Sequence, residues 1–281
     1  MASREEYFDL ALKAFFIEDN GTENQYQEVF TFLCDYLYNA LGIHFLYRYR
    51  PDDKWARDQT IFENDKIWFQ PMSQKNDSLE FAFDIDYHDP LAPFLVVCPN
   101  LAPLQTATDF LQQQFEEYKN KCSIACFSDS YDNNELWSCY SNLDHGYCIR
   151  YSSLDILSQF QCFLLPVIYQ DEVPTLSEAI EHTRRNSRLL PYYIVYKRIS
   201  TKLMYPWSKE REWRVIRTLN SNGGKGEAIQ FPKPNAVYLG YQAEESFASE
   251  IKRICQEKHI SVFKMEKDDS TGRLNPKQIQ G

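Results

Sequence analysis

Two carboxylates, Glu210 and Glu212, lie two residues apart in a segment bounded by Trp207 and Trp213. If this segment is a strand, both carboxylates point to one face, because side chains alternate along a strand. Two carboxylates on one face repel each other unless a cation or a substrate hydroxyl lies between them. The pair therefore indicates either a solvated strand with alternating charges or an acid site that holds a hydroxyl, and the tryptophans disfavour full solvation.

Tyrosine and arginine alternate in a second candidate segment, Tyr47-Arg48-Tyr49-Arg50. On a strand the two arginines share one face and the two tyrosines share the other. Arginine presents a planar fork that binds phosphate, and tyrosine can stack on a base or a nicotinamide ring. The alternative interpretation is an amphipathic edge strand with its arginines in water, and the pattern alone favours that alternative.

A third group of polar and aromatic residues follows an expected strand that ends at Ser128. Trp137 and Tyr140 are three residues apart, so they share one face of an expected short helix. His145 could act as a base, but a histidine beside a glycine that opens a strand is more often structural. Ser128 with His145 does not predict hydrolase chemistry, since no glycine elbow surrounds the serine.

These segments, taken in order, resemble a bacterial family known as domain of unknown function 2971. The resemblance spans about residues 45–217. It rests on Leu46 to Arg50, Asn76-Asp77 with Glu80, Cys126 to Ser128, Trp137 to Tyr140 with His145 to Ile149, and Trp207 with Glu210, Glu212, Trp213 and Arg214. One loop departs from the family, since Lys75-Asn76-Asp77-Ser78-Leu79-Glu80 stands where the family has Phe-Asn-Asp-Pro-Phe-Glu. This departure weakens any role for the loop.

The order and types of these residues are also similar to the layout of ADP-ribosyltransferases, above all the toxins that modify nucleic acids. This similarity implies a split, mixed β-sheet that holds NAD in a central cleft. It also implies that Glu212 stabilises the oxocarbenium ion formed when the nicotinamide–ribose bond breaks, while Glu210 orients or deprotonates the acceptor. The residues it implies for binding NAD are Tyr47, Arg48, Tyr49, Arg50, Ser128, Trp137, Tyr140 and His145, and those for the acceptor are Lys202 and Arg214.

The resemblance implies a cytoplasmic bacterial enzyme, a toxin or phage-defence effector, that transfers ADP-ribose from NAD to RNA, DNA or protein. An antitoxin or another neutralising partner would accompany it, and no metal is required. No G-x-G-x-x-G motif follows a strand, so a Rossmann mode of NAD binding is not implied. Two other functions stay open: an NAD glycohydrolase with water as the acceptor, and a non-catalytic module that binds a nucleotide or a partner.

A nucleic-acid acceptor would require a local basic surface, because the chain as a whole is acidic. The 281 residues include 30 Lys and Arg against 40 Asp and Glu, a formal net charge of −10. This balance disfavours a nonspecific nucleic-acid coat. The candidate basic patch comprises Lys197, Arg198 and Lys202, near Arg184, Arg185 and Arg188. The alternative is a solvated helix face.

Composition places the chain among globular proteins. Hydrophobic residues make up 43% and aromatic residues 15%, which excludes wholesale disorder. No run approaches the ~20 apolar residues of a membrane helix, and the acidic start does not predict a signal peptide. The eight cysteines contain no CxxC pair. Cys122, Cys126, Cys139 and Cys148 with His145 fit no standard zinc module, so reduced, buried thiols are the favoured interpretation.

The elements that would position these residues predict an α+β fold. A helical hairpin over residues 1–44 is expected to pack on a main domain over residues 45–281. The expected strands cover residues 45–50, 66–69, 123–128, 146–151, 164–169, 213–217, 228–231, 236–240 and 260–265. The expected helices cover residues 105–120, 134–140, 176–190 and 243–257. Residues 213–217 and 228–231 are expected to form a hairpin across the turn at 220–224.

Overall fold

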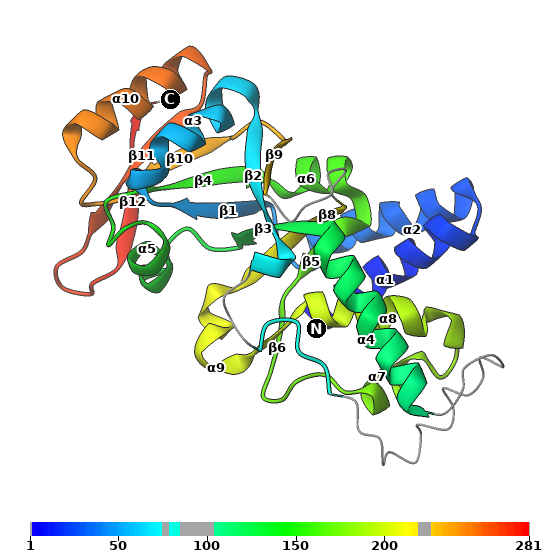
Figure 1. The fold of residues 1–281 in the computed structure, drawn as a ribbon. Helices are drawn as coiled ribbons and strands as arrows, with labels where there is room; N and C mark the ends of the chain where they lie inside the picture. Colours follow the sequence, from blue (N-terminus) through cyan, green and yellow to red (C-terminus); the bar gives the residue numbers. More distant parts are fainter. Residues whose placement is uncertain (1, 75–78, 85–103, 219–225, 281) are drawn as a thin grey trace.

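A computed structural model of the chain describes residues 2–74, 79–84, 104–218 and 226–280, whose arrangement Figure 1 shows. Its helices are α1 (Arg4–Asn20), α2 (Glu23–Asp35), α3 (Trp55–Asn64), α4 (Leu104–Lys121), α5 (Asn134–Tyr140), α6 (Ser153–Phe160), α7 (Leu176–Thr183), α8 (Leu190–Ile199), α9 (Met204–Trp207) and α10 (Glu245–Glu257). Its strands are β1 (Phe45–Arg50), β2 (Lys66–Pro71), β3 (Cys122–Ser128), β4 (Tyr147–Ser152), β5 (Leu164–Pro166), β6 (Ile168–Gln170), β7 (Thr201–Leu203), β8 (Glu212–Thr218), β9 (Glu227–Gln230), β10 (Ala236–Leu239), β11 (Ser261–Lys267) and β12 (Leu274–Gln280).

The larger sheet is mixed. Its strands run in the order β12-β11-β10-β4-β1-β3-β2-β9, and β8 pairs with both β3 and β5. The pairs are antiparallel except for β10 and β11, which are parallel. Strands β6 and β7 form a separate parallel pair. The α+β class and the mixed sheet predicted from the sequence are confirmed.

The sheet branches at β3. Strand β8 pairs with β3 along its whole length, from Cys122 to Ser128, and so occupies one edge of β3. On the other edge, β1 meets β3 only at Ser128, whereas β2 meets it at Ser123 and Ile124. Strands β1 and β2 therefore diverge from the same edge of β3, and the candidate site described below lies at the β1 end of this branch.

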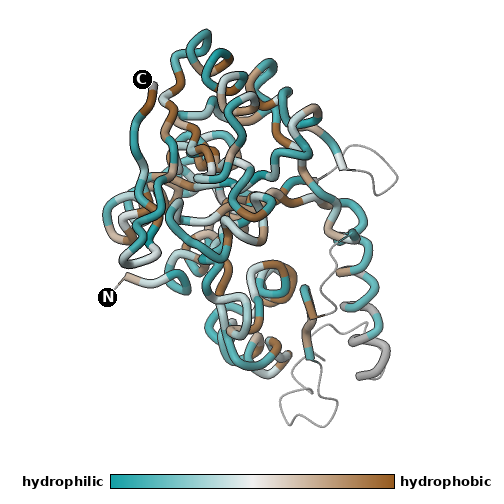
Figure 2. The backbone as a smooth tube through the Cα atoms, turned by 90° about the vertical axis from the view of Figure 1, so that its left-hand side faces the viewer, coloured by the Kyte–Doolittle hydropathy of each residue, from teal (hydrophilic) through white to brown (hydrophobic). Residues whose placement is uncertain are grey.

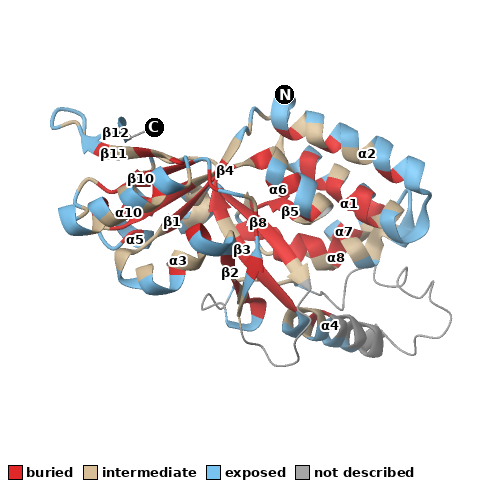
Figure 3. Ribbon diagram, turned by 90° about the horizontal axis from the view of Figure 1, so that it is seen from above, coloured by how far each residue is buried: buried red, intermediate tan, exposed pale blue. Residues whose placement is uncertain are grey.

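Strand alternation divides the core between the two faces of the sheet. On one face, Leu46 and Ile149 pack with the buried residues of α3 and α10. On the other face, Tyr47 and Tyr49 pack with Trp137 of α5. Figure 2 shows hydrophobic residues concentrated on the inner segments of the chain, and Figure 3 shows that β3, β4 and β8 are mostly buried. The polar side chains of β1 therefore face α3, while its tyrosines face α5.

The predicted N-terminal helical hairpin is present as α1 and α2. Ser3 caps α1 by accepting a hydrogen bond from the Glu6 N–H, and Thr22 with Gln25 forms a capping box at α2. The Phe15 ring of α1 stacks on Tyr196 of α8 at 4.0 Å between centroids. Helix α1 is therefore part of the main core, whereas Figure 3 shows α2 on the outside of the molecule.

Several local predictions are wrong in their boundaries or pairing. The predicted hairpin is wrong, because β9 pairs with β2 while β8 pairs with β3 and β5; its turn at 220–224 lies outside the described residues. The strand predicted over 164–169 is two strands in different sheets, separated at Val167. The helix predicted over 176–190 ends at Thr183. Helices α3, α6, α8 and α9 and strands β7 and β12 had no sequence prediction.

Within the described ranges, no helix combines the length and the apolar character that crossing a lipid bilayer requires.

Candidate functional site

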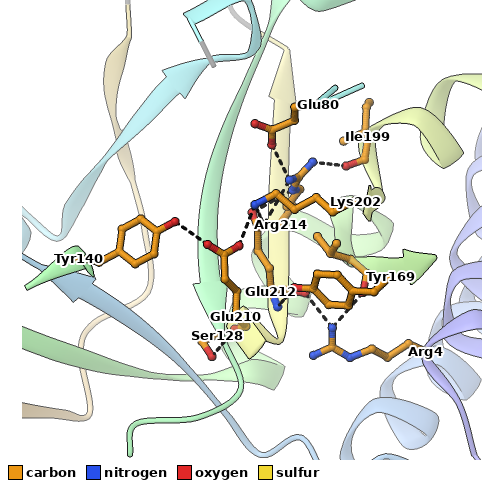
Figure 4. A network of polar contacts seen from close by, with 11 residues as sticks. Arg4, Glu80, Ser128, Tyr140, Tyr169, Ile199, Lys202, Glu210, Glu212 and Arg214 are labelled. Carbon is orange, nitrogen blue, oxygen red and sulfur yellow. Dashed lines mark hydrogen bonds and ion pairs between the residues drawn. The ribbon is translucent and has the colours of Figure 1, made fainter. Parts of the chain in front are cut away.

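A pocket of about 120 Å³ lies where β1, β3 and the start of β8 meet. Its walls are formed by tyrosines, a leucine, three charged side chains and part of β3. The lining residues are Tyr47, Tyr49, Leu136 and Tyr140, then Lys202, Glu210 and Glu212, then Cys126, Phe127 and Ser128. Figure 4 shows the charged part of this pocket, with Glu210 between Tyr140 and Lys202. The pocket thus contains both carboxylates that the sequence singled out.

Glu210 and Glu212 converge through a turn and not through strand alternation. Glu210 ends a short 3-10 turn, Arg211 adopts a left-handed conformation with φ 49°, and Glu212 begins β8. The Lys202 ammonium lies 2.7 Å from Glu210 Oε2 and 3.0 Å from Glu212 Oε2. The cation that two adjacent carboxylates require is therefore Lys202. The predicted geometry of a shared strand face is wrong, although the predicted pair is present.

The charge on Lys202 is held by its two partners. Its side chain is 8% exposed, and burial by itself would lower its pKa. Glu212 and Glu210 outweigh burial and raise the pKa of Lys202 above its ordinary value. The ammonium also lies 4.7 Å from the centre of the Trp207 ring, which favours a cation. Lys202 is therefore charged throughout the physiological pH range.

A second buried cation, Arg214, fixes Glu212 from behind. Its Nε donates to Glu212 Oε1 at 2.9 Å, and its two Nη groups donate to Glu80 Oε1 and to the Ile199 carbonyl, each at 2.5 Å. Arg214 is fully buried, so its place does not fit the predicted contact with a macromolecular acceptor. It acts instead as the internal partner of two carboxylates. Together with Lys202 and Glu210, these groups carry three negative and two positive charges.

Tyr140 closes the mouth of the pocket over Glu210. Its hydroxyl donates to Glu210 Oε1 at 2.5 Å, and the residue is 45% exposed. Burial of the hydroxyl and the adjacent Glu210 carboxylate raise the pKa of Tyr140, so the hydroxyl stays protonated and remains a donor. The charged cluster therefore reaches solvent at Tyr140 and Glu210.

Residues from distant segments hold the turn that carries the two carboxylates. The Arg4 guanidinium donates to the carbonyls of Arg211 at 2.9 Å and Glu212 at 3.1 Å. The Glu212 N–H donates to the Tyr169 hydroxyl at 2.8 Å, and the Ser128 hydroxyl donates to the Glu210 carbonyl at 2.8 Å. Arg4 and Tyr169 were not predicted, because nothing in their local sequence indicates a contact with β8.

Four of the residues predicted to bind NAD lie away from this pocket. Arg48 and Arg50 are on the opposite face of β1: Arg48 donates to the Trp68 carbonyl at 2.7 Å, and Arg50 pairs with Asp58 at 2.6 Å. Burial lowers the pKa of Arg48 to about 10. These places do not fit phosphate binding, because both guanidinium groups are held by the protein on the face covered by α3.

The positions of Trp137 and His145 favour a structural role for both residues. Trp137 is fully buried, and its Nε1 donates to the Tyr131 carbonyl at 2.7 Å, so its ring is not open to a ligand. His145 lies outside the described lining of the pocket. It precedes Gly146, where a Cβ would lie 2.1 Å from the Arg50 carbonyl oxygen, so only glycine fits. The structural interpretation of this histidine–glycine pair is therefore favoured.

Only part of the predicted basic patch is exposed, namely Arg184, Arg185 and Arg188. Lys197 and Arg198 are buried; Lys197 pairs with Glu178 at 3.2 Å, and Arg198 donates to the Phe81 carbonyl at 3.0 Å. Lys202 belongs to the pocket. In the loop over residues 75–80 that belongs to the family resemblance, Glu80 pairs with Arg214, whereas Asn76 and Asp77 lie outside the described residues.

Six cysteines have described side chains, and they differ in burial. Cys122 and Cys148 are buried, Cys139 is exposed, and Cys126 is half-buried and lines the pocket. In the part of the chain that the structure describes, no group of three or more His, Cys, Asp or Glu side chains is arranged to hold a metal ion.

Comparison of this chain with known protein families, with curated proteins and with solved structures gave no match.

Proposed function

We propose that the chain cleaves NAD at the nicotinamide–ribose bond and transfers ADP-ribose to a macromolecule, either a nucleic acid or a protein. One observation carries the proposal: Glu210 and Glu212 converge on Lys202 in a tyrosine-lined pocket at the branch of the sheet. The resemblance to ADP-ribosyltransferases in the order of motifs supports the same activity. By that resemblance, the biological role is that of a cytoplasmic bacterial toxin or phage-defence effector, opposed by a neutralising partner.

The charge of the pocket suits this reaction. The nicotinamide ring of NAD is cationic, and breaking its bond to ribose develops an oxocarbenium ion. Glu80, Glu210, Glu212, Lys202 and Arg214 together carry a net charge of −1, and carboxylates stabilise a developing cation. The faces of tyrosine rings also attract cations and stack on aromatic ligands.

The two carboxylates differ in access, which suggests different roles. Glu212 is 4% exposed and held in place by Arg214, so it is the fixed group that accepts a ribose hydroxyl and stabilises the cation. Glu210 lies at the mouth beside Tyr140, so it orients or deprotonates the acceptor. An ammonium has three donor hydrogens, one of which Glu210 receives, while Glu212 lies 3.0 Å from the same ammonium as an ion pair. In this proposal Lys202 gives a remaining hydrogen to a ribose hydroxyl or phosphate oxygen.

The size of the pocket limits what it holds. Its 120 Å³ is below the roughly 300–1,000 Å³ of sites that enclose whole drug-sized ligands. In this proposal the pocket therefore holds only the reacting part of NAD, the nicotinamide ring and the ribose carbon bonded to it, while the adenosine half lies along the surface outside it.

The test uses purified protein, radiolabelled NAD and a bacterial lysate. Glu212→Gln removes the proposed catalytic charge, and Glu135→Gln is the matched control, because Glu135 is an exposed carboxylate paired with Lys209 outside the pocket. We expect label on RNA, DNA or protein with the wild type and with Glu135→Gln, and its loss with Glu212→Gln. Labelled free ADP-ribose without labelled macromolecule would instead show a glycohydrolase.

A non-catalytic binding module is the second candidate, and the full engagement of Glu212 favours it. Its Oε1 binds Arg214 and its Oε2 binds Lys202 and Arg214 before any ligand arrives. Such a module would bind NAD, measured by calorimetry, without consuming it. Saturable binding with no nicotinamide release from folded protein would therefore replace the transferase proposal with this one.

A further inference from the structure

A groove separate from the pocket runs between α1 and α2. Its volume is about 710 Å³, several times that of the pocket with the two carboxylates. Leu10 and Ile17 of α1 and Val29 and Phe32 of α2 give it an apolar floor. Phe32 is 54% exposed, so its ring presents apolar surface to solvent in this groove.

The spacing of the lining residues matches the shape of a helix. Leu10, Lys13 and Ile17 recur on α1 at helical spacing, and Glu28 with Phe32 recurs on α2. Two helices side by side present ridges and grooves into which a third helix packs. An amphipathic helix in such a groove is a common mode of recognition, with apolar anchors on one face.

The helical hairpin that contains the groove is acidic. Residues 4–35 contain two basic and eight acidic side chains, so this stretch carries −6 of the chain's net charge of −10. All eight acidic residues are exposed; they are Glu5, Glu6, Asp9, Glu18, Asp19, Glu23, Glu28 and Asp35. Figure 3 shows α2 exposed along the outer edge of the molecule. The charged residues that line the groove itself are Glu28 and Asp35 of α2 and Lys13 of α1. Helix α2 holds Glu23, Glu28 and Asp35 and no basic residue, so α2 forms the acidic rim of the groove.

We propose that this groove binds an amphipathic helix of a partner protein, with leucine-like residues on one face and lysines or arginines along its flanks. The apolar face would cover Val29 and Phe32, and the basic flanks would meet Glu28 and Asp35. This docking surface is independent of the activity proposed above.

The negative charge of the acidic rim disfavours nucleic acids, anionic lipids and a second copy of the chain as the occupant of the groove. Nucleic acids and anionic lipid surfaces carry negative charge and would be repelled by the acidic rim. A second copy of the chain that used the same face would bring two acidic rims together, since such an interface is self-complementary. A basic helix is the occupant that gains from both the apolar floor and the rim.

The test measures binding of a fluorescent 18-residue peptide of leucine and lysine, arranged with one apolar helical face, to the full chain by anisotropy. A peptide of the same composition in scrambled order has no apolar face, and a leucine–glutamate analogue reverses the charge. We expect saturable binding of the first peptide and at least about tenfold weaker binding of the other two. Equal binding of the scrambled peptide would overturn the proposal, because it would show charge attraction alone.

Two variants locate the site. Phe32→Asp should weaken peptide binding about tenfold, while Leu143→Asp, a change at another exposed apolar residue, should leave it within about twofold. Unchanged far-ultraviolet circular dichroism and melting temperature establish that both variants are folded. Equal effects of the two variants, or none from Phe32→Asp, would place binding elsewhere and refute the groove.

A charge-matched pair tests the rim. The first double variant is Glu28→Lys/Asp35→Lys. The control is Glu257→Lys/Glu266→Lys, which changes the net charge by the same amount at exposed residues of α10 and β11. We expect only the first pair to weaken binding. Equal weakening would overturn the proposal in favour of long-range attraction. Sedimentation of the free chain as a dimer that Phe32→Asp dissociates would identify a second copy as the occupant instead, and RNA binding lost in Phe32→Asp would identify a nucleic acid.

Discussion

Removal of the cation between the two carboxylates is the sharpest test of the site. Lys202→Met keeps much of the side-chain length and deletes the ammonium that lies 2.7 Å from Glu210 and 3.0 Å from Glu212. Each contact is worth on the order of 5 kcal/mol at an effective dielectric constant of about 20, and the cost of desolvating the charges offsets much of this. The net loss for breaking a buried ion pair is about 3–5 kcal/mol, and the 8% exposure of Lys202 justifies that range.

The effect of Lys202→Met should be present at both pH 5 and pH 8. The pKa of Lys202 is raised, so its contribution to stability is complete below the ordinary lysine pKa and disappears only as pH rises through the folded value. The wild-type lysine therefore stays charged from pH 5 to pH 8. In the variant that contribution is absent at both pH values. We expect Lys202→Met to destabilise the fold at pH 5 as well as at pH 8.

Urea unfolding at pH 5 and pH 8 measures both quantities. Lys209→Met is the matched control, because Lys209 is also paired with a glutamate, Glu135, but is exposed; it should have no measurable effect. Lys202→Arg should recover part of the lost stability. If Lys202→Met were no more destabilising than Lys209→Met at either pH, the assignment of Lys202 as the shared counter-ion would be refuted.

Three further predictions concern the site and the core. Arg214→Met should destabilise the fold by about 3–5 kcal/mol in urea unfolding, because it leaves two buried carboxylates without their common cation, and a loss below about 1 kcal/mol would contradict the buried ion pairs. Tyr140→Phe should lower the rate of nicotinamide release, because it removes the hydroxyl that donates to Glu210, while the melting temperature changes little. An unchanged rate would show that Tyr140 takes no part in the reaction. Phe15→Ala should cost about 3–5 kcal/mol, whereas Phe32→Ala on the outside of the same hairpin should cost far less; similar losses would contradict the packing of α1 in the core.

The sequence predicts elements well where the controlling signal is local. Helix α5 has the predicted bounds, because Asn133 caps it through hydrogen bonds from the N–H groups of Glu135 and Leu136. Strand β1 also has its predicted bounds, since its alternation reflects two differently covered faces. The local alternation does not show, however, which face of β1 lines the pocket. Tyr47 and Tyr49 line it, whereas Arg48 and Arg50, which were predicted to bind NAD, lie on the opposite face.

Predictions that depend on distant partners failed. The apolar run over 164–169 is broken because the Val167 N–H bonds to the Glu212 carbonyl while the Ile168 N–H bonds to the Ser200 carbonyl. A turn-rich segment after β8 predicts a hairpin, but β9 joins β2 instead. For the site, the residue types predicted the acid pair and its need for a cation, whereas the role of Arg4 depends on a contact across more than two hundred residues.

The charged site is assembled from distant segments of the chain, and this has a consequence for biosynthesis. The pocket joins Ser128 and Tyr140 to residues 202–214, and its turn is held by a side chain from the first helix. Contacts between such distant segments form only after the intervening chain has closed large loops. A nascent chain that has not yet released Arg214 from the ribosome therefore lacks the complete charged cluster, so any activity of this pocket begins only after most of the chain has been made.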